Sequence, residues 1–231
     1  MRRLTRWLLW TFAVVIAAFV LLESWYAAHI WWWRDHPPQE TSFMAARLAE
    51  LRERRPDAHI AYRWVPYERI SVELKRAMIA AEDAKFVDHE GFDWEGIHNA
   101  LDRNYRKGRV VAGGSTISQQ LAKNLFLSAE RSYWRKGEEA VLTIMLEAIL
   151  DKRRIFELYL NVIEWGNGVF GCEAAARRYF GVSASALDAP QAARLAAMAP
   201  NPRYYERHPD ARGLARKIGI VLGRMPAAEL P

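Results

Sequence analysis

The clearest pattern in the chain is an uncharged apolar run near its beginning. Residues 7–22 read WLLWTFAVVIAAFVLL, and after the single charge of Glu23 the apolar character continues to Trp33. A helix needs ~20 apolar residues to cross the hydrocarbon core of a bilayer. The pattern therefore predicts one N-terminal transmembrane helix over residues 7–33, with tryptophans and a tyrosine near its two ends, where the membrane interfaces would lie.

Three arginines lie in the basic tail before this run, residues 1–6. By the positive-inside rule the tail stays in the cytoplasm and the chain after the helix crosses the membrane. A cleaved signal peptide is the alternative, but it would have a shorter apolar region and a small-residue cleavage site. Ala27-Ala28 is a weak candidate for such a site, and Trp-rich sequence follows it. The pattern favours an uncleaved anchor.

Residues 34–64 have a different character, with mixed charges and the pair Pro37-Pro38. Proline does not fit a helix interior, so the membrane helix must end before this pair. Residues 41–54 then predict a short amphipathic helix. We expect the segment to be a juxtamembrane connector that carries no chemistry of its own.

Residues 65–231 show helical periodicity almost throughout. Ser71 can cap a helix whose apolar positions recur at three- and four-residue spacing from Leu74 to Ala81. Residues 138–150 are apolar nearly all round, which is typical of a helix buried in the middle of a domain. Further helices are predicted at residues 153–160, 172–179, 189–198 and 211–222. Alternating apolar and polar runs are too short to predict a sheet, so the fold class is mainly α.

The composition narrows the classes of protein that fit. With 51% hydrophobic residues among 231, the chain has ample material for a core and is not a disordered protein. Its one cysteine, Cys172, has no partner for an internal disulfide, and the six histidines show no zinc-ligand spacing. The net charge of +6 suggests an anionic partner. Nucleic acid is not favoured, because the basic residues lie beside an anchor and among carboxylates, not along one exposed helix.

The first candidate cluster is EDAKFVDHEGFD, residues 82–93. Glu82 lies at the margin of the apolar face of the helix capped by Ser71. Partial burial would raise the pKa of its carboxyl, as suits a general base or acid. The alternative is that Glu82 and Asp83 merely end a helix, and His89 alone is more typical of a structural histidine.

The second candidate cluster is GGSTISQQLAKN, residues 113–124. Ser115 and Thr116 can cap a helix whose first N–H groups would face an anion. The cluster lacks the ending of a Walker A loop, and an ordinary capped helix is the alternative. Donors follow on one face of this helix at Gln119, Gln120, Lys123 and Asn124.

The third candidate cluster, residues 131–139, ends in RKGEE and leads into the most apolar helix. It combines Glu139 with Arg131, Arg135 and Lys136, and Lys123 lies upstream. A buried carboxylate needs a cationic partner, so simple ion pairing is one interpretation. The other is that the cations gather where a diphosphate binds, with Glu139 orienting them or a metal.

Taken in order, these clusters resemble the successive motifs of the family 51 glycosyltransferases, the peptidoglycan glycosyltransferases. The resemblance continues through KRRIFELYLN and EWGNGVFGCEAAARRYFG and runs from about Val65 to about Tyr204. It implies a lysozyme-like helical domain with a membrane-facing jaw, placed at residues 92–111. An ordinary solvated basic loop is the alternative for that segment. The resemblance also implies that lipid II is polymerised into β-1,4-linked glycan strands with release of undecaprenyl diphosphate.

The resemblance implies roles for individual residues. Glu82 would be the base that takes the proton from the 4-hydroxyl of the acceptor, and Glu139 would be the second essential carboxylate. The positions that match the phosphate-binding residues are Lys123, Arg131 and Lys136. The positions that match the cleft lining are Ser115, Gln119, Gln120 and Asn124. Ser118 departs from the more usual threonine but keeps the hydroxyl.

The resemblance also sets expectations about partners and location. The substrates would be lipid II and the growing glycan strand. Further partners would be inner-membrane lipids and wall-synthesis proteins of cell division or elongation. The chain would pass once through the inner membrane, with a cytoplasmic N-terminus and a periplasmic catalytic domain. No cofactor is required; the acidic residues allow Mg²⁺ or Mn²⁺ at the diphosphate, although no ligand set is evident.

Two alternatives remain open at this stage: a membrane-anchored peptidoglycan hydrolase or lytic enzyme, and an inactive cell-wall scaffold. A hydrolase also uses two carboxylates but needs no cationic diphosphate site, and an inactive scaffold would be free to lose Glu82 or Glu139. The chain has no S-x-x-K or K-T-G motif before Pro231. Transpeptidase activity is therefore not expected.

Overall fold

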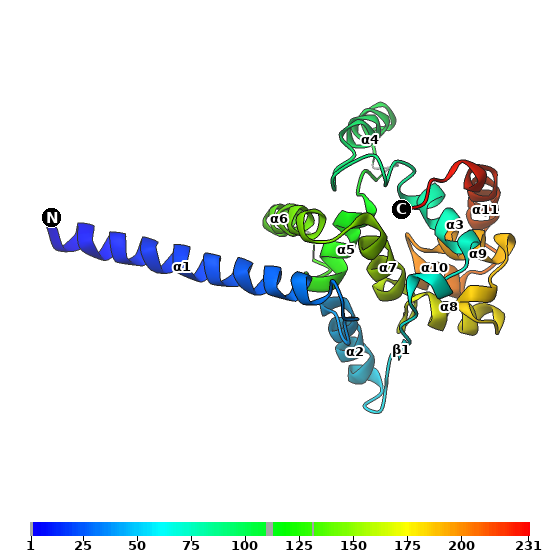
Figure 1. The fold of residues 1–231 in the computed structure, drawn as a ribbon, viewed down its shortest axis with the longest axis horizontal. Coiled ribbons are helices and arrows are strands. Elements are labelled where there is room, and N and C mark those ends of the chain that lie inside the picture. Colours follow the sequence, from blue (N-terminus) through cyan, green and yellow to red (C-terminus); the bar gives the residue numbers. More distant parts are fainter. Residues whose placement is uncertain (1, 110–112, 131) are drawn as a thin grey trace.

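The computed structural model describes residues 2–109, 113–130 and 132–231, and most of them are helical (Figure 1). The helices are α1 (Arg2–Trp32), α2 (Ser42–Arg54), α3 (Val72–Glu82), α4 (Trp94–Lys107), α5 (Ile117–Phe126), α6 (Tyr133–Ile149), α7 (Lys152–Val162), α8 (Cys172–Phe180), α9 (Ala189–Met198), α10 (Pro202–Arg207) and α11 (Arg212–Arg224). Short 3₁₀ turns lie at Tyr67–Arg69, Ala184–Ala186 and Met225–Ala227. The mainly α fold class is confirmed.

The apolar N-terminal run forms one long helix, as predicted. Within α1, Thr5–Trp32 is long and apolar enough to cross a membrane, and most of the helix projects away from the rest of the chain (Figure 1). Its last turns are different, because Tyr26 and Ile30 are buried against the domain. The ring of Tyr26 lies 4.9 Å from that of Phe126, at the end of α5. The anchor is therefore joined to the domain by side-chain packing as well as by the chain.

The segment between the anchor and the domain is also held in place. Thr41 caps α2, and Met44 is fully buried. Arg47 donates two hydrogen bonds to Glu164, from Nε at 2.7 Å and from Nη2 at 2.9 Å. α2 lies against α5. The residues expected to form a connector thus contribute to the folded structure.

The core joins two groups of helices. α3 lies against α9 and α11, whereas α5 lies against α6 and α7 (Figure 1). Ser71 caps α3 through the N–H of Leu74, and Leu74, Ala77 and Met78 are all fully buried. The helices predicted from periodicity at residues 153–160, 172–179, 189–198 and 211–222 correspond to α7, α8, α9 and α11. Each predicted helix therefore has its counterpart.

A small sheet beside α8 is not anticipated by the sequence pattern. Its strands are β1 (Ala61–Tyr62), β2 (Glu164–Gly166) and β3 (Val169–Phe170), in the order β1-β3-β2. β1 pairs parallel to β3 with Ala61 opposite Val169, and β2 pairs antiparallel to β3. Strands of two or three residues are too short to produce a recognisable alternation.

The prediction that residues 138–150 form a helix buried on all sides is wrong. The helix is longer, as α6, and one side of it is open: Trp134 is 87% exposed and Ile144 is 59% exposed. The helix lies beside α1. An exposed apolar surface is stable where it faces the hydrocarbon of a membrane instead of water, and the apolar anchor helix runs next to this one.

The segment expected to form the jaw is a strongly amphipathic helix, α4. Asp93 caps its start and Gly108 ends it in a left-handed conformation at φ 61°. Ala100 packs inward, whereas Trp94, Leu101 and Tyr105 are largely exposed. Val110 and Val111, also assigned to the jaw from the sequence, lie outside the described residues.

Candidate active site

Glu82 is the last residue of α3, and it stands where the buried face of that helix reaches the surface. It follows Met78 by one helical turn, so it lies on the same side as the core positions but is itself only half-buried. It lines a pocket of about 150 Å³ between α3, α9 and α11. Burial raises the pKa of the Glu82 carboxyl above its usual value, and the neighbouring Asp83 adds to the shift.

Two side chains position the Glu82 carboxylate. Gln120 Nε2 donates to Glu82 Oε2 at 2.8 Å, which opposes the rise in its pKa. Tyr159 Oη in turn donates to Gln120 Oε1 at 3.1 Å. Burial raises the pKa of Tyr159 well above its usual value, so its hydroxyl stays a donor. Because Gln120 Oε1 accepts from Tyr159, the amide nitrogen of Gln120 must face Glu82.

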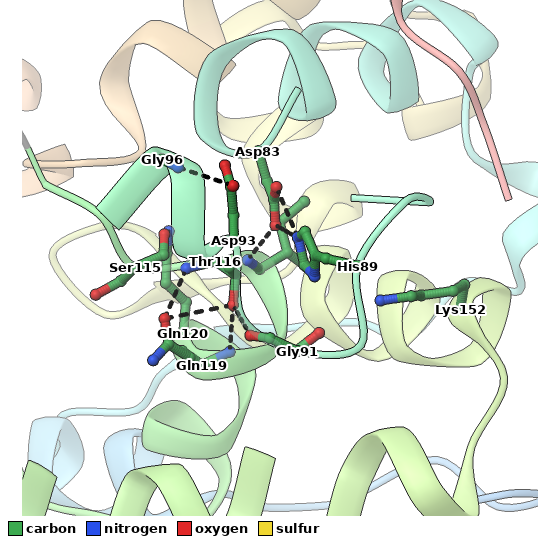
Figure 2. A network of polar contacts seen from close by, with 12 residues as sticks. Asp83, His89, Gly91, Asp93, Gly96, Ser115, Thr116, Gln119, Gln120 and Lys152 are labelled. Atoms are coloured by element: carbon green, nitrogen blue, oxygen red, sulfur yellow. Dashed lines mark hydrogen bonds and ion pairs between the residues drawn. The ribbon is translucent and has the colours of Figure 1, made fainter. Parts of the chain in front are cut away.

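Asp83 connects the end of α3 to the beginning of α5. Its carboxylate accepts from the backbone N–H of Ile117 at 3.0 Å, and His89 Nε2 lies 3.0 Å from Oδ1 (Figure 2). Thr116 Oγ1 donates to the carbonyl of Gly91 at 2.6 Å, which fixes the loop that follows α3 against the beginning of α5. The first and second sequence clusters are thereby joined by buried hydrogen bonds, and His89 has the structural role expected.

The second cluster begins with a capping box. Thr116 accepts from the N–H of Gln119, and Gln119 Oε1 accepts from the N–H of Thr116 at 3.0 Å. Gln119 is 4% exposed, so its side chain is committed to the cap, while Ser115 beside it is exposed. Asn124 is also buried and donates to the carbonyl of Gln120 at 2.7 Å. Of the four residues expected to line the cleft, Gln120 is the one that contacts a predicted catalytic side chain.

The third cluster is built around a buried carboxylate. Glu139 is 3% exposed and accepts from Arg135 Nη1 at 2.8 Å and from Lys136 Nζ. An ion-paired Glu139 is what both interpretations of the sequence require. Arg135 and Lys136 line an open groove of about 400 Å³ with Ser132 and Tyr133. Arg131, predicted to bind phosphate, lies outside the described residues.

Lys123 is influenced by the charges of both predicted catalytic carboxylates. Burial lowers the pKa of its ammonium group, as do Arg135 and Lys136, whereas Glu139 and Glu82 oppose the shift. One lysine therefore interacts electrostatically both with a partly buried carboxyl of raised pKa and with the cation cluster around Glu139.

Comparison with known proteins identifies the family. The family model described as Transglycosylase matches residues 49–226. The chain belongs to the transglycosylase family. Its relatives include the biosynthetic peptidoglycan transglycosylase of Dechloromonas aromatica, 61% identical over the full length of both chains. That of Chromobacterium violaceum is 61% identical over 95% of this chain and 96% of its own, and that of Azoarcus sp. is 58% identical over the full length of both.

Family membership confirms the resemblance drawn from the motifs and the lysozyme-like helical fold. The transglycosylase match begins at residue 49, within α2, so the family fold includes part of the segment expected to be a connector. It ends at residue 226, just after α11. The helices that line the pocket beside Glu82 therefore all belong to the family domain.

The basic residues of α11 in this transglycosylase are not predicted from its sequence. Lys217 and Arg224 line the pocket with Glu82, and the charge of Lys217 lowers the pKa of Glu82 against the effect of burial. They are separated from Glu82 by more than 130 residues, and only the packing of α11 on α3 brings them together. Tyr159 was also missed, although its motif was part of the resemblance.

Among the described residues of the transglycosylase domain, no group of three or more His, Cys, Asp or Glu side chains is arranged to hold a metal ion. Glu139 is the carboxylate nearest to the cationic cluster, and Arg135 and Lys136 already occupy both of its oxygens. A divalent ion at that point would have to bind mainly through oxygens of the substrate.

Proposed function

We propose that this chain is a membrane-anchored peptidoglycan glycosyltransferase that polymerises lipid II into β-1,4-linked glycan strands. The proposal rests above all on one observation: the chain combines a partly buried Glu82 carboxyl, held by Gln120 at 2.8 Å, with a cluster of cations around Glu139, and the charge of Lys123 acts on both carboxylates. Glycosyl transfer from a lipid diphosphate needs a base on the acceptor side and positive charge on the leaving-group side.

Glu82 is the general base. Its raised pKa lies closer to the working pH than that of an ordinary carboxyl, which makes proton transfer from the acceptor 4-hydroxyl more favourable. The bond to Gln120 keeps one carboxylate oxygen oriented. The other has no hydrogen-bond partner among the described residues and can accept the hydroxyl proton. As the proton leaves, the acceptor oxygen attacks the anomeric carbon of the growing strand, and the bond from that carbon to the diphosphate oxygen breaks.

The cations stabilise the departing undecaprenyl diphosphate. Lys123 and Lys136, with Arg131 from the sequence, supply the phosphate contacts, and Glu139 holds Lys136 and Arg135 in place. A diphosphate is a good leaving group once its charge is neutralised, so no acid is needed to protonate it. The reaction requires no cofactor; Mg²⁺ or Mn²⁺, if it takes part, would bind chiefly through the diphosphate oxygens.

The hydrolase alternative is not favoured. Glycosidases place two carboxyl groups on either side of the bond that they cleave, one as acid and the other as base or nucleophile. In this chain Glu139 is held by two cations, which suits charge neutralisation rather than attack on a sugar. An inactive scaffold would have no use for a carboxyl positioned through Gln120 and Tyr159.

The anchor and the exposed apolar surfaces support action at a membrane. Lipid II keeps its polyprenyl tail in the bilayer, so the site must work at the membrane surface. The span of α1 fits a single pass through the inner membrane, and the arginines before it favour a cytoplasmic N-terminus with the catalytic domain in the periplasm. Trp94 and Tyr105 of α4 and Trp134 of α6 are exposed aromatic side chains suited to the interface.

The decisive experiment incubates the detergent-solubilised full chain with labelled lipid II in the presence of penicillin and separates the products on a gel. A ladder that a muramidase collapses would establish glycan polymerisation. Glu82→Gln should abolish the ladder while lipid II binding is retained, and Glu73→Gln on the same helix is the matched control. Shortening of preformed glycan, with lipid II left intact, would refute the proposal in favour of a hydrolase. Loss of neither substrate would favour a scaffold.

A further inference from the structure

A second pocket, of about 480 Å³, lies where the end of α2, the β2–β3 turn, α8 and α10 meet. It is lined by arginines from three helices: Arg54, Arg178, Arg203 and Arg207. Two carboxylates, Glu50 and Glu206, share the lining. The side chains that surround the pocket therefore carry an excess of two positive charges. None of these residues belongs to the Glu82 pocket or to the cation cluster around Glu139.

The floor of this arginine pocket is rigid. Glu206 Oε2 accepts from the backbone N–H of Asn167 at 2.8 Å, and Tyr179 Oη donates to the carbonyl of Trp165 at 2.8 Å. A Cβ at Gly166 would lie 2.3 Å from Tyr179 Oη and 3.2 Å from Glu206 Cδ. The close approach of both side chains to β2 therefore requires glycine at this position, and the pocket is formed before any ligand arrives.

The guanidinium groups in the pocket are only loosely paired. Arg178 lies 3.6 Å from Glu206 and Arg203 lies 3.5 Å from Glu50. Both distances exceed those of direct charge-assisted hydrogen bonds, which are ~2.7–2.9 Å. Arg207 donates to the carbonyl of Arg203 and, within the described parts of the chain, has no carboxylate within 4 Å. N–H donors thus remain for an external anion, and the planar guanidinium fork suits a carboxylate.

The arginine pocket and the pocket of Glu82 are connected by a short stretch of chain. Pro200 lines the pocket of Glu82, and Arg203 follows it by three residues. Their Cα atoms are therefore at most ~11 Å apart. A peptide spans ~3.3–3.6 Å per residue when extended, so four extended residues are longer than this Cα separation.

We propose that the arginine pocket binds the carboxylates of the stem peptide carried by the acceptor lipid II. This inference rests on the proposed function, which supplies the substrate. The excess of two positive charges matches a peptide with more than one carboxylate, and the volume lies in the range of pockets for small ligands, ~300–1,000 Å³. The pocket would hold the peptide and leave the reacting 4-hydroxyl to Glu82.

The first test measures binding of the free synthetic stem pentapeptide to the detergent-solubilised full chain by titration calorimetry. Arg203→Gln/Arg207→Gln should weaken binding about tenfold or more, because two charge-assisted contacts are lost. The control Arg55→Gln/Arg153→Gln removes two exposed arginines outside the pocket and should leave binding unchanged. Absence of binding to the wild type, or equal weakening in both variants, would overturn the inference.

The second test separates this inference from the proposed function. Lipid II polymerisation is measured with the natural peptide and with its carboxylates amidated. For the Arg203→Gln/Arg207→Gln variant, KM for natural lipid II should rise about tenfold with kcat unchanged, whereas the amidated substrate should give the same KM with variant and wild type. If the wild type polymerises lipid II but the variant has the same KM, the peptide site is refuted and the polymerase stands. Equal affinity for an unrelated acidic peptide would overturn the stem-peptide assignment.

Discussion

Replacing Asp83 by alanine tests the connection between the two helices that carry Glu82 and Gln120. The substitution removes the acceptor of two buried donors, the backbone N–H of Ile117 and the ring N–H of His89. Each buried donor left without a partner costs ~1–3 kcal/mol, so the free energy of unfolding should fall by ~2–6 kcal/mol. For a chain of this length each kcal/mol lowers Tm by ~2–4 °C, so the loss should be about 4 °C or more.

The same substitution should reduce catalysis even where the protein is folded. Without Asp83 the end of α3 can shift relative to α5, and Glu82 then loses its 2.8 Å hydrogen bond with Gln120. A misplacement of ~1 Å can cost ~100-fold in rate. We expect kcat for lipid II polymerisation to fall by about 10- to 100-fold, measured at least 15 °C below the variant's Tm.

Two further variants complete the experiment. Asp83→Asn keeps an acceptor for Ile117, and its amide can donate to His89 in the other tautomer, so it should recover part of both losses. Asp88→Ala, on the exposed side of the same loop, is the control and should match the wild type. Wild-type Tm and kcat in Asp83→Ala would refute the reasoning, as would equal effects at both positions.

The remaining predictions concern pH and the anchor. Glu82 must be ionised to act as a base, and its pKa is raised. When the pH is lowered, kcat/KM should therefore begin to fall at a pH above the usual carboxyl range; a fall confined to that range would contradict the assignment. Folding favours the protonated form of Glu82, so the stability that this carboxyl contributes is lost as the pH rises through its folded-state pKa. At neutral pH the Glu82→Gln variant should therefore have a Tm at least equal to that of the wild type. Tyr26→Phe removes the 2.8 Å hydrogen bond to Glu138, which is next to Glu139. The variant should stay in membranes, but its kcat in the gel assay should fall several-fold. An unchanged kcat would mean that the anchor acts only as a tether.

Local patterns predicted most of the helices because each pattern records a local cause. Ser71 and Thr116 satisfy the first N–H groups of the helices that they precede, and the apolar spacing after Ser71 gives α3 its buried face. The prediction failed for the helix at residues 138–150, where the same apolar pattern would suit a protein core or a membrane surface. The short sheet was missed because its strands have too few residues to show a period.

The candidate site was predicted only in part. Glu82, Gln120, Lys123, Lys136 and Glu139 were identified from their motifs, and the structure brings them into one region. The partners of these residues were not all foreseen. Lys217 comes from α11, and the arginine pocket combines residues from four separate segments, so no local spacing could indicate either.

The sequence by itself determined the anchor, the helical class and the chemical groups, because hydrophobic length, helical period and motif residues are all local properties of the chain. Tertiary structure decided which of those groups act together. Glu82 has a raised pKa because α9 and α11 cover it, and its carboxylate is oriented because Tyr159 of α7 turns the amide of Gln120. Burial and hydrogen-bond direction depend on neighbours far away along the chain, and only packing supplies them.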